Sequence, residues 1–436
     1  MESTISSLSS LQLEPRQPLH HVDLTPEVLN GLFARFDGDW NNPERDEAHE
    51  RGLRTHLFKT DVIDQLLRSV EDDRVLRLIG TITETHEERL VVCARGLAAA
   101  LSRLASRPRA FSATPSWLWV LHNHVYYLTD AEISPQLIHG ACDALTSPAC
   151  HPWPKKNALQ ALMRVALRGT ATLRPLLAPR ADEVAAWCST LLGDGRLDET
   201  HLNACYTVCS FAYSLDRPEL ARAASEWLRA RTREVGEPSD LVRMISGRYE
   251  RKTRRHLQRT GYLRPGETWH MYLGMLSHPS ADLRFGGAVI LTVVLEAVGH
   301  SAFDIAPFET PSSRLYLDEA LDARVRTDAA LTRQDVETLR CAATGALPHA
   351  LVAEAALRLA KDPVAEVRHL GEVACSQLPR RVLREVVWCP STHHLFHPGA
   401  RALVRFMLLL SQRGDIPLPA DLLVMHVLPC ACFAVP

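Results

Sequence analysis

The sequence predicts an all-α fold, an α-solenoid of antiparallel helix pairs, on three observations. Apolar residues recur at the i, i+3, i+4 spacing of a helix face along most of the chain, as in Leu159, Leu162 and Met163. No segment shows a convincing strand-like alternation, and only 118–128 gathers β-prone residues. Two short stretches far apart repeat one pattern. Many short helices without strands favour stacked helix pairs, with a separate N-terminal helical bundle as the alternative for the first part.

The expected helices are mostly 10–18 residues long and are separated by Pro, Gly, Ser or Asp. The first has a full start signal, because Thr25-Pro26-Glu27 supplies an N-cap, a proline at the first helical position and an acid near the positive end of the helix dipole. The segment 74–104 is long enough for two helices. The expected helices span 25–36, 60–70, 74–104, 131–146, 155–168, 181–193, 199–214, 217–232, 238–260, 267–276, 280–298, 332–345, 349–360, 363–377, 380–388, 398–412 and 419–428.

The repeated pattern is a proline followed by an alanine, an acid, an aliphatic residue and an arginine in the same register. The first copy runs His278-Pro279-Ser280-Ala281-Asp282-Leu283-Arg284 and the second runs Asp362-Pro363-Val364-Ala365-Glu366-Val367-Arg368. An apolar-rich helix is expected after each. Self-similarity of this kind is the signature of a stacked helical repeat.

The spacing of the two copies suggests a unit of about 42 residues. Arg326 lies 42 residues from both Arg284 and Arg368, and Arg243 lies 41 residues before Arg284. A competing register through Arg340 gives a spacing of 28 residues to Arg368. The proline-containing pair carries the prediction, because arginine is common throughout this chain.

These stretches resemble HEAT-like and armadillo-type helical repeats, over about 238–378. In that family the second helix of a repeat often begins with Asp-Pro and carries an aliphatic-arginine pair. The resemblance implies that Arg284, Arg368 and Asp362 bridge neighbouring repeats and are structural. It identifies no specific family.

The predicted organisation has three parts. Residues 1–22 are Ser-rich and are expected to form a flexible tail, 23–150 an N-terminal helical region, and 151–436 the HEAT-like repeats. The chain ends in an apolar segment that is expected to cap the last repeat, while Cys430 and Cys432 leave a modified or reactive C-x-C as the alternative.

Composition indicates a folded protein without a global drive toward nucleic acid or anionic membranes, because the net charge is −2 over 436 residues. Only five of the 49 basic residues are lysines, a bias typical of a GC-rich bacterial genome. The eleven cysteines form no zinc or disulfide pattern, and Cys205 and Cys209 are expected in the core, so a cytoplasmic protein is expected. We expect no membrane span and no signal peptide, and secretion by another route stays open.

The strongest charge feature is the stretch 248–264, which contains a single acid, Glu250. Arg251, Arg255 and Arg259 follow an i, i+4, i+8 spacing and share one helical face. Such a face fits an acidic protein surface or nucleic-acid phosphates, and a solvated face paired with neighbouring acids is the alternative. The predicted partner-binding residues are Arg248, Arg251, Lys252, Arg254, Arg255 and Arg259.

Three other clusters contain residue types that occur in metal-binding, catalytic or ligand-binding sites. His393, His394 and His397 lack the further ligand that a metal site needs, so no metal is expected there. The charged residues of 46–56 are expected to form a solvated helix. The aromatic and histidine residues of 117–127 are expected in the core or at an interface, with stacking on bases or on a planar ligand as the alternative. No phosphate-binding loop or nucleophile elbow occurs, so no cofactor is expected and any catalytic residue is unknown.

Three functions remain open from the sequence. The favoured one is a non-enzymatic scaffold or adaptor that binds a protein partner through its concave or basic face. The second is a DNA-binding enzyme of the alkylpurine DNA glycosylase type, which the chain resembles only in the type of repeat. The third is an enzyme of unknown class with its site in the N-terminal half, around 46–56 or 117–127.

Overall fold

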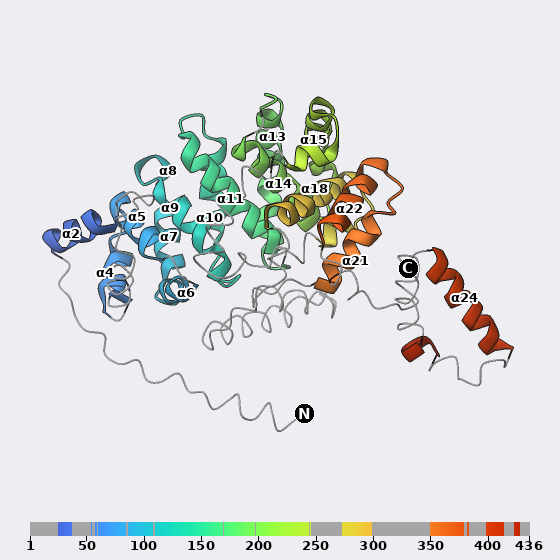
Figure 1. Ribbon diagram of the computed structural model, residues 1–436. Helices are drawn as coiled ribbons and strands as arrows, with labels where there is room; N and C mark the ends of the chain where they lie inside the picture. Colours follow the sequence, from blue (N-terminus) through green and yellow to red (C-terminus); the bar gives the residue numbers. More distant parts are fainter. Residues whose placement is uncertain are drawn as a thin grey trace, which may run out of the picture. The chain divides into compact units, whose positions relative to one another are not determined.

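The computed structural model shows two compact units, Met1–Ala161 and Leu162–Pro436, and each is described by itself (Figure 1). The described residues are 25–36, 54, 57–58, 60–83, 86–107, 110–168, 170–196, 198–243, 245, 273–298, 349–378, 382, 398–413 and 423–427. Within these ranges the structure is all-α, with short 3-10 and π segments and no β-strand, as the sequence predicts.

The first unit is a series of short helices that pack on one another. α5 contacts α2, α4 and α9, and α7 contacts α6, α8, α9 and α10. The elements are α2 (Pro26–Phe36), α4 (Val62–Arg68), α5 (Asp73–Ile82), α6 (His86–Ala94), α7 (Leu97–Ala105), α8 (Ala110–Ala113), α9 (Ser116–His124), the 3-10 segment η1 (Val125–Tyr127), α10 (Pro135–Thr146) and α11 (Pro152–Arg168), which contains the boundary between the units.

The predicted segment 74–104 contains three helices rather than two, namely α5, α6 and all but the last residue of α7. The break between α6 and α7 lies at Gly96, whose φ of 98° is in the left-handed region that side chains disfavour. Its N–H donates to the carbonyl of Cys93 at 3.0 Å, which ends α6. A single glycine therefore splits a stretch whose apolar pattern runs on without a break.

Several residues of the aromatic cluster 117–127 lie in the core of the first unit. Trp117 is fully buried on α9, and a Cβ at Gly140 of α10 would come within 3.2 Å of its ring. A Cβ at Gly80 of α5 would lie 2.1 Å from the ring of Trp119, so α5 and α9 meet through that glycine. His124 is also buried. The β-prone stretch is thus helical, and stacking of nucleic-acid bases on Trp117 is excluded by its burial.

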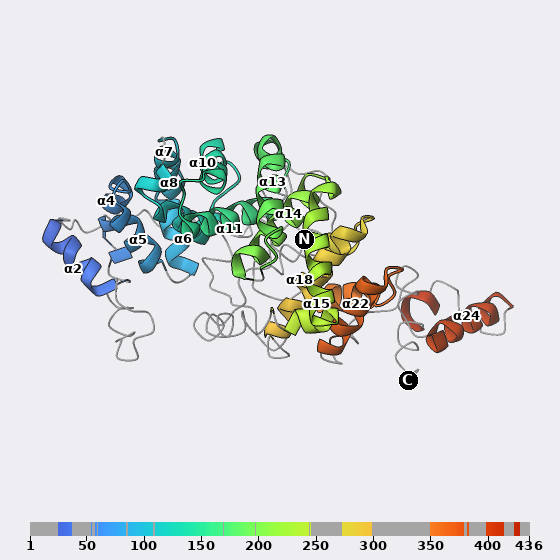
Figure 2. The same cartoon turned by 90° about the horizontal axis from the view of Figure 1, so that it is seen from above.

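The second unit continues as packed helices in chain order. α14 contacts α13, α15 and α18, α18 contacts α15 and α22, and α21 packs on α22 (Figure 2). The elements are α12 (Arg174–Leu177), η2 (Ala178–Arg180), α13 (Ala181–Leu192), α14 (Glu199–Ser214), η3 (Pro218–Ala221), α15 (Arg222–Val235), α18 (Ala281–Val298), α21 (His349–Leu359), α22 (Ala365–Gln377), α24 (Pro398–Gln412) and the π segment η6 (Leu423–Val427). Cys205 and Cys209 lie in the core, as predicted.

The two copies of the repeated pattern start two helices that pack directly on each other, α18 and α22. A guanidinium nitrogen of Arg284 lies 2.7 Å from a carboxylate oxygen of Asp362, so the copies are adjacent in space. Packed helices lie about 8–10 Å apart, so a further unit between the copies would separate them by about 20 Å. The expected 42-residue unit is therefore wrong for this interval. Arg326 and Arg340 lie outside the described residues.

No helix within the described ranges is long and apolar enough to cross a membrane.

Candidate partner-binding sites

Both copies of the pattern build the same helix start. In the first copy the His278 Nδ1 accepts a hydrogen bond from the Ser280 N–H at 3.0 Å, and in the second the Asp362 Oδ1 accepts one from the Val364 N–H at 2.9 Å. Proline has no N–H, so the residue after it offers the first donor of the turn that leads into the helix. His278 and Asp362, which accept from that donor, are called the cap residues of their turns, and the helices themselves begin at Ala281 and Ala365. The same cap occurs at α11, where His151 Nδ1 accepts from the Trp153 N–H at 3.3 Å.

The arginine of each copy closes its own turn. Arg284 donates to the carbonyl of His278 at 2.9 Å, and Arg368 donates to the carbonyl of Asp362 at 3.0 Å. Each bond spans six residues, from the arginine back to the cap residue. The local sequence pattern therefore specifies one local structure twice.

The first copy also makes a bond that the second lacks. The Arg284 Nε and Nη2 donate to the two carboxylate oxygens of Asp362 at 2.7 and 3.2 Å, a bidentate pair. The Arg284 side chain is 15% exposed and that of Asp362 is 7% exposed. This geometry confirms the structural role that the HEAT-like resemblance implies for Arg284 and Asp362. Arg368 is exposed, and no carboxylate within the described ranges pairs with it.

The acids of the two copies are held by one shared arginine. Arg229 of α15 donates to Asp282 and to Glu366, each at 2.9 Å, and its guanidinium lies 5.1 Å from the centre of the Phe285 ring. Asp282 also accepts from the Ser225 hydroxyl at 2.8 Å. Burial lowers the pKa of Arg229, but the bonds to Glu366 and Asp282 outweigh it, and the net shift is upward. The structure therefore uses these charges to join α15, α18 and α22.

The basic stretch that the sequence singles out lies outside the described residues, which stop at 245 and resume at 273. Arg248, Arg251, Lys252, Arg254, Arg255 and Arg259 therefore stay a prediction. The histidines His393, His394 and His397 and the thiols of Cys430 and Cys432 also lie outside. Of the 46–56 stretch only Arg54 is described, and it pairs with Glu88 at 3.3 Å in a buried position.

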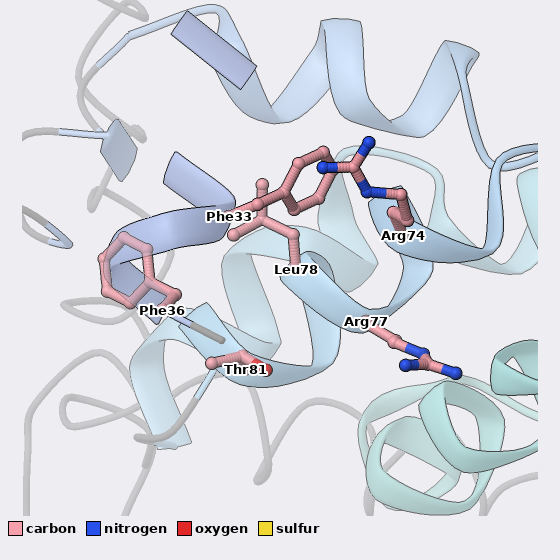
Figure 3. Close-up of a pocket in the computed structure, with 6 residues that line it drawn as sticks. All are labelled: Phe33, Phe36, Arg74, Arg77, Leu78 and Thr81. Carbon is pink, nitrogen blue, oxygen red and sulfur yellow. The ribbon is translucent and has the colours of Figure 1, made fainter. Parts of the chain in front are cut away.

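A shallow pocket in the first unit lies between α2 and α5 (Figure 3). Its lining combines aromatic rings with two arginines, and consists of Phe33, Phe36, Arg74, Arg77, Leu78 and Thr81. The Arg74 guanidinium lies 4.2 Å from the centre of the Phe33 ring and donates to the Asn30 amide oxygen, while Arg77 pairs with Asp73 at 3.1 Å. Arg74 gives the pocket a positively charged group that could bind a small anion. The sequence pattern of α5 did not predict this pocket.

A buried histidine lies between two carboxylates in the second unit. The His201 Nε2 is 2.6 Å from Asp194 Oδ1 and its Nδ1 is 2.8 Å from Asp198 Oδ1, while the ring stacks on Trp227. The Arg196 N–H and the His201 ring lower the pKa of Asp194. Burial raises the pKa of Asp198, but the hydrogen bonds from His201 outweigh it, so the net shift is downward. This cluster ties the loop before α14 to that helix.

Three cysteines of the second unit have thiols whose surroundings favour the protonated form. Burial raises the pKa of the Cys188 thiol, and a hydrogen bond with Cys209 together with burial raises that of Cys205. Partly buried Cys375 has a pKa raised to about 11, again by burial. Protonated thiols are poor nucleophiles and metal ligands. Across the described parts of the chain, no cluster of His, Cys, Asp and Glu has the arrangement of a metal site.

Toward the end of the chain, α24 packs on the segment that follows it. Val404 and Leu423 are buried together, with Met407, Leu408 and Val424 packed against them. Phe406 and Leu409 lie one turn apart on another face of α24 and are 58% and 52% exposed.

No model of a protein family matches the chain, and no curated protein matches it. Among solved structures, a designed armadillo repeat protein matches with a TM-score of 0.32 at 12% identity, over 73% of this chain and 98% of that one. Importin beta matches with a TM-score of 0.34 at 11% identity, over 93% of this chain and 50% of its own length. The karyopherin Kap121p bound to the extreme C-terminus of the protein phosphatase Cdc14p matches with a TM-score of 0.28 at 14% identity, over 94% and 42%.

The described residues by themselves form an all-α arrangement of helices that pack on their neighbours in the chain.

Proposed function

We propose that the protein is a non-enzymatic helical-repeat scaffold that binds an acidic protein partner through the basic stretch 248–264. The observation that carries the proposal is the contrast between two groups of arginines. Those that build the repeats, such as Arg229 and Arg284, are held by carboxylates of the same chain. The stretch 248–264 instead contains seven basic residues and one acid.

This contrast supports a partner that brings its own negative charge. Internal ion pairs leave a guanidinium little capacity for a second carboxylate. Basic residues in excess over neighbouring acids create a local positive potential even when the whole chain has a net charge of −2. Such a potential steers acidic surfaces to the site and speeds their association.

The test is a charge reversal of the predicted face. The variant R251E/R255E/R259E is compared with the wild type for binding of a fluorescein-labelled 20-residue polyglutamate peptide and of a 20-base-pair DNA duplex, by fluorescence anisotropy at several salt concentrations. We expect the variant to lose at least about tenfold in affinity for the peptide, since each tenfold step needs only about 1.4 kcal/mol.

A matched control changes the same charge elsewhere. Arg222, Arg233 and Arg405 are exposed, and R222E/R233E/R405E alters the net charge by the same amount. The control should bind like the wild type. Equal losses in both variants, or an unchanged R251E/R255E/R259E, would overturn the proposal. Duplex binding that is tighter than peptide binding and falls steeply with salt would instead favour the DNA-binding enzyme.

A further inference from the structure

The solvent-facing side of α24 is apolar at its centre. The exposed residues of this helix recur about one turn apart, so they share one side of it. They are Ala402, Arg405, Phe406, Leu409, Gln412 and the next residue along the chain, Arg413. Phe406 and Leu409 are 58% and 52% exposed, the highest values among the large apolar side chains of the described residues. Another side of α24 packs through Val404 on Leu423, so the exposed apolar side is not part of that core.

The solvent-facing side of α15 gives a comparison within the same unit. Its exposed residues are Arg222, Glu226, Arg233 and Glu234, which are all charged, with two of each sign. Polar and charged residues of this kind are what a helix ordinarily presents to water. The exposed side of α24 instead combines large apolar side chains with arginines alone, because 398–413 contains no aspartate or glutamate. Such a side favours a partner surface that is both apolar and anionic.

The arginines of this side lie beside its apolar residues. Arg405 directly precedes Phe406, and Arg413 lies one turn after Leu409. Both arginines are exposed. An arginine has a long side chain, so its stem can stay on apolar surface while its guanidinium reaches an anionic group at the edge of that surface. The apolar residues and the charges can therefore act on one partner at the same time.

The charges also distinguish between possible partners. A second copy of α24 would bring arginines against arginines, with no acid in 398–413 to pair with them. An anionic lipid bilayer fits better, because its acyl chains accept Phe406 and Leu409 and its phosphates accept hydrogen bonds from guanidinium groups. With 15 residues α24 is shorter than the roughly 20 that cross a bilayer, so it would lie in the plane of the surface.

We propose that α24 is a reversible anchor on anionic membrane surfaces. The helix lies among the lipid headgroups, with Phe406 and Leu409 inserted toward the acyl chains and with Arg405 and Arg413 on the lipid phosphates. One such helix gives weak, salt-sensitive binding, because a small apolar area and a few charges supply all of its affinity. The inference does not rest on the proposed function, since it uses residues outside 248–264 and a different class of partner.

The test is flotation of the full-length protein with vesicles of equimolar phosphatidylcholine and phosphatidylglycerol, or of phosphatidylcholine alone. We expect the wild type to bind the anionic vesicles at least about tenfold more tightly than the neutral ones. F406S/L409S removes the apolar residues and R405Q/R413Q removes the charges, and each should lower the affinity at least about fivefold.

Matched controls make the same changes elsewhere. R222Q/R233Q removes two exposed charges from α15, and V28S/W153S removes two other exposed apolar side chains. Both controls should bind the anionic vesicles like the wild type. No flotation of the wild type, equal binding to neutral vesicles, or unchanged binding by F406S/L409S would overturn the inference.

Two further outcomes would assign the observations elsewhere and overturn the anchor. Loss of flotation in R251E/R255E/R259E with normal flotation of F406S/L409S would place lipid binding in the basic stretch. A dimer of the wild type in sedimentation velocity that becomes a monomer in F406S/L409S, without flotation, would show that a second copy covers α24. The proposed function is tested separately, because F406S/L409S should bind polyglutamate like the wild type.

A second measurement uses the unmodified chain and so does not depend on the folding of a variant. Hydrogen–deuterium exchange read by mass spectrometry compares the wild type with and without the anionic vesicles. Bound lipid shields and orders the helix, so peptides from 398–413 should exchange more slowly with anionic vesicles and not with neutral ones. Peptides from α15 serve as the internal reference and should not change. Equal exchange of 398–413 with and without the anionic vesicles contradicts the anchor.

Discussion

The two copies of the repeated pattern, 278–284 and 362–368, share their sequence logic and their local structure but differ in what their arginines contact. The Arg284 side chain is 15% exposed and is bound to Asp362, whereas Arg368 is exposed and, among the described residues, is bound to a backbone carbonyl and to no carboxylate. The acceptor in the turn before each helix also differs, because it is a histidine before α18 and an aspartate before α22. The local pattern thus sets the turn, while a side chain 78 residues further along the chain gives Arg284 its carboxylate partner.

The largest effect should come from removing the acid between the copies. Asp362→Ala leaves the mostly buried Arg284 without a carboxylate partner and removes the acceptor of the Val364 N–H, so we expect a loss of about 3–5 kcal/mol in the free energy of unfolding. Arg368→Ala should cost less than about 0.5 kcal/mol. Urea unfolding followed by circular dichroism measures both. Equal losses in the two variants would refute the distinction between the copies.

A second contrast concerns the glycine that lies nine residues after each cap. A Cβ at Gly371 would lie 2.2 Å from the backbone nitrogen of Ala360, while a Cβ at Gly287 would approach Met275 Cβ and a Leu276 methyl at 3.0 and 3.1 Å. Backbone atoms move less easily than side-chain atoms to relieve a close contact. Gly371→Ala should therefore lower the free energy of unfolding by about 3 kcal/mol, and Gly287→Ala by about 1 kcal/mol or less. The same urea unfolding experiment compares them, and a larger loss for Gly287→Ala contradicts the packing described.

Arg229 tests the link that joins the acids of both copies. Its side chain is 23% exposed and bonds Asp282 and Glu366, so Arg229→Ala should cost about 1–2 kcal/mol. Arg243 forms an exposed pair with Asp240, and Arg243→Ala should cost less than about 0.5 kcal/mol. A double-mutant cycle with Glu366→Gln should show coupling for Arg229 and none for Arg243. Absence of coupling with Arg229 would mean that this bridge adds nothing to stability.

The smallest expected effect is a pH dependence of stability that arises at Asp194 and Asp198, outside both copies of the pattern. The pKa values of Asp194 and Asp198 are lowered in the folded chain, so these carboxylates stabilise it above their unfolded pKa of about 3.9. That contribution is lost as the pH falls through their lowered folded values. Asp198→Asn should therefore have a lower urea midpoint than the wild type at pH 7, with the two midpoints converging between about pH 5 and pH 2. A difference that grows toward acid pH would contradict this reading.

Much of the fold could be predicted from the sequence because helix starts and apolar spacing are local signals. The expected helix 199–214 coincides with α14, and 280–298 and 398–412 match α18 and α24 to within one residue. The helix break at Gly96 was not predicted, because it depends on one backbone angle and the apolar pattern continues on both sides of the glycine. The sites were harder to predict from the sequence, because nothing in the pattern of α5 indicates that Arg74 lies on the Phe33 ring of α2.

By itself the sequence determined the all-α class, the helix starts and the existence of two equivalent turns, since each depends on residues a few positions apart. Only the tertiary structure decided that the copies are adjacent rather than two units apart and that Arg229 joins the acids of both. It also decided that Arg284 has a carboxylate partner while Arg368 has none within the described ranges. These outcomes depend on which side chains meet across 53 residues or more of chain, as Arg229 and Asp282 do. Packing sets such distances, and no local pattern encodes them.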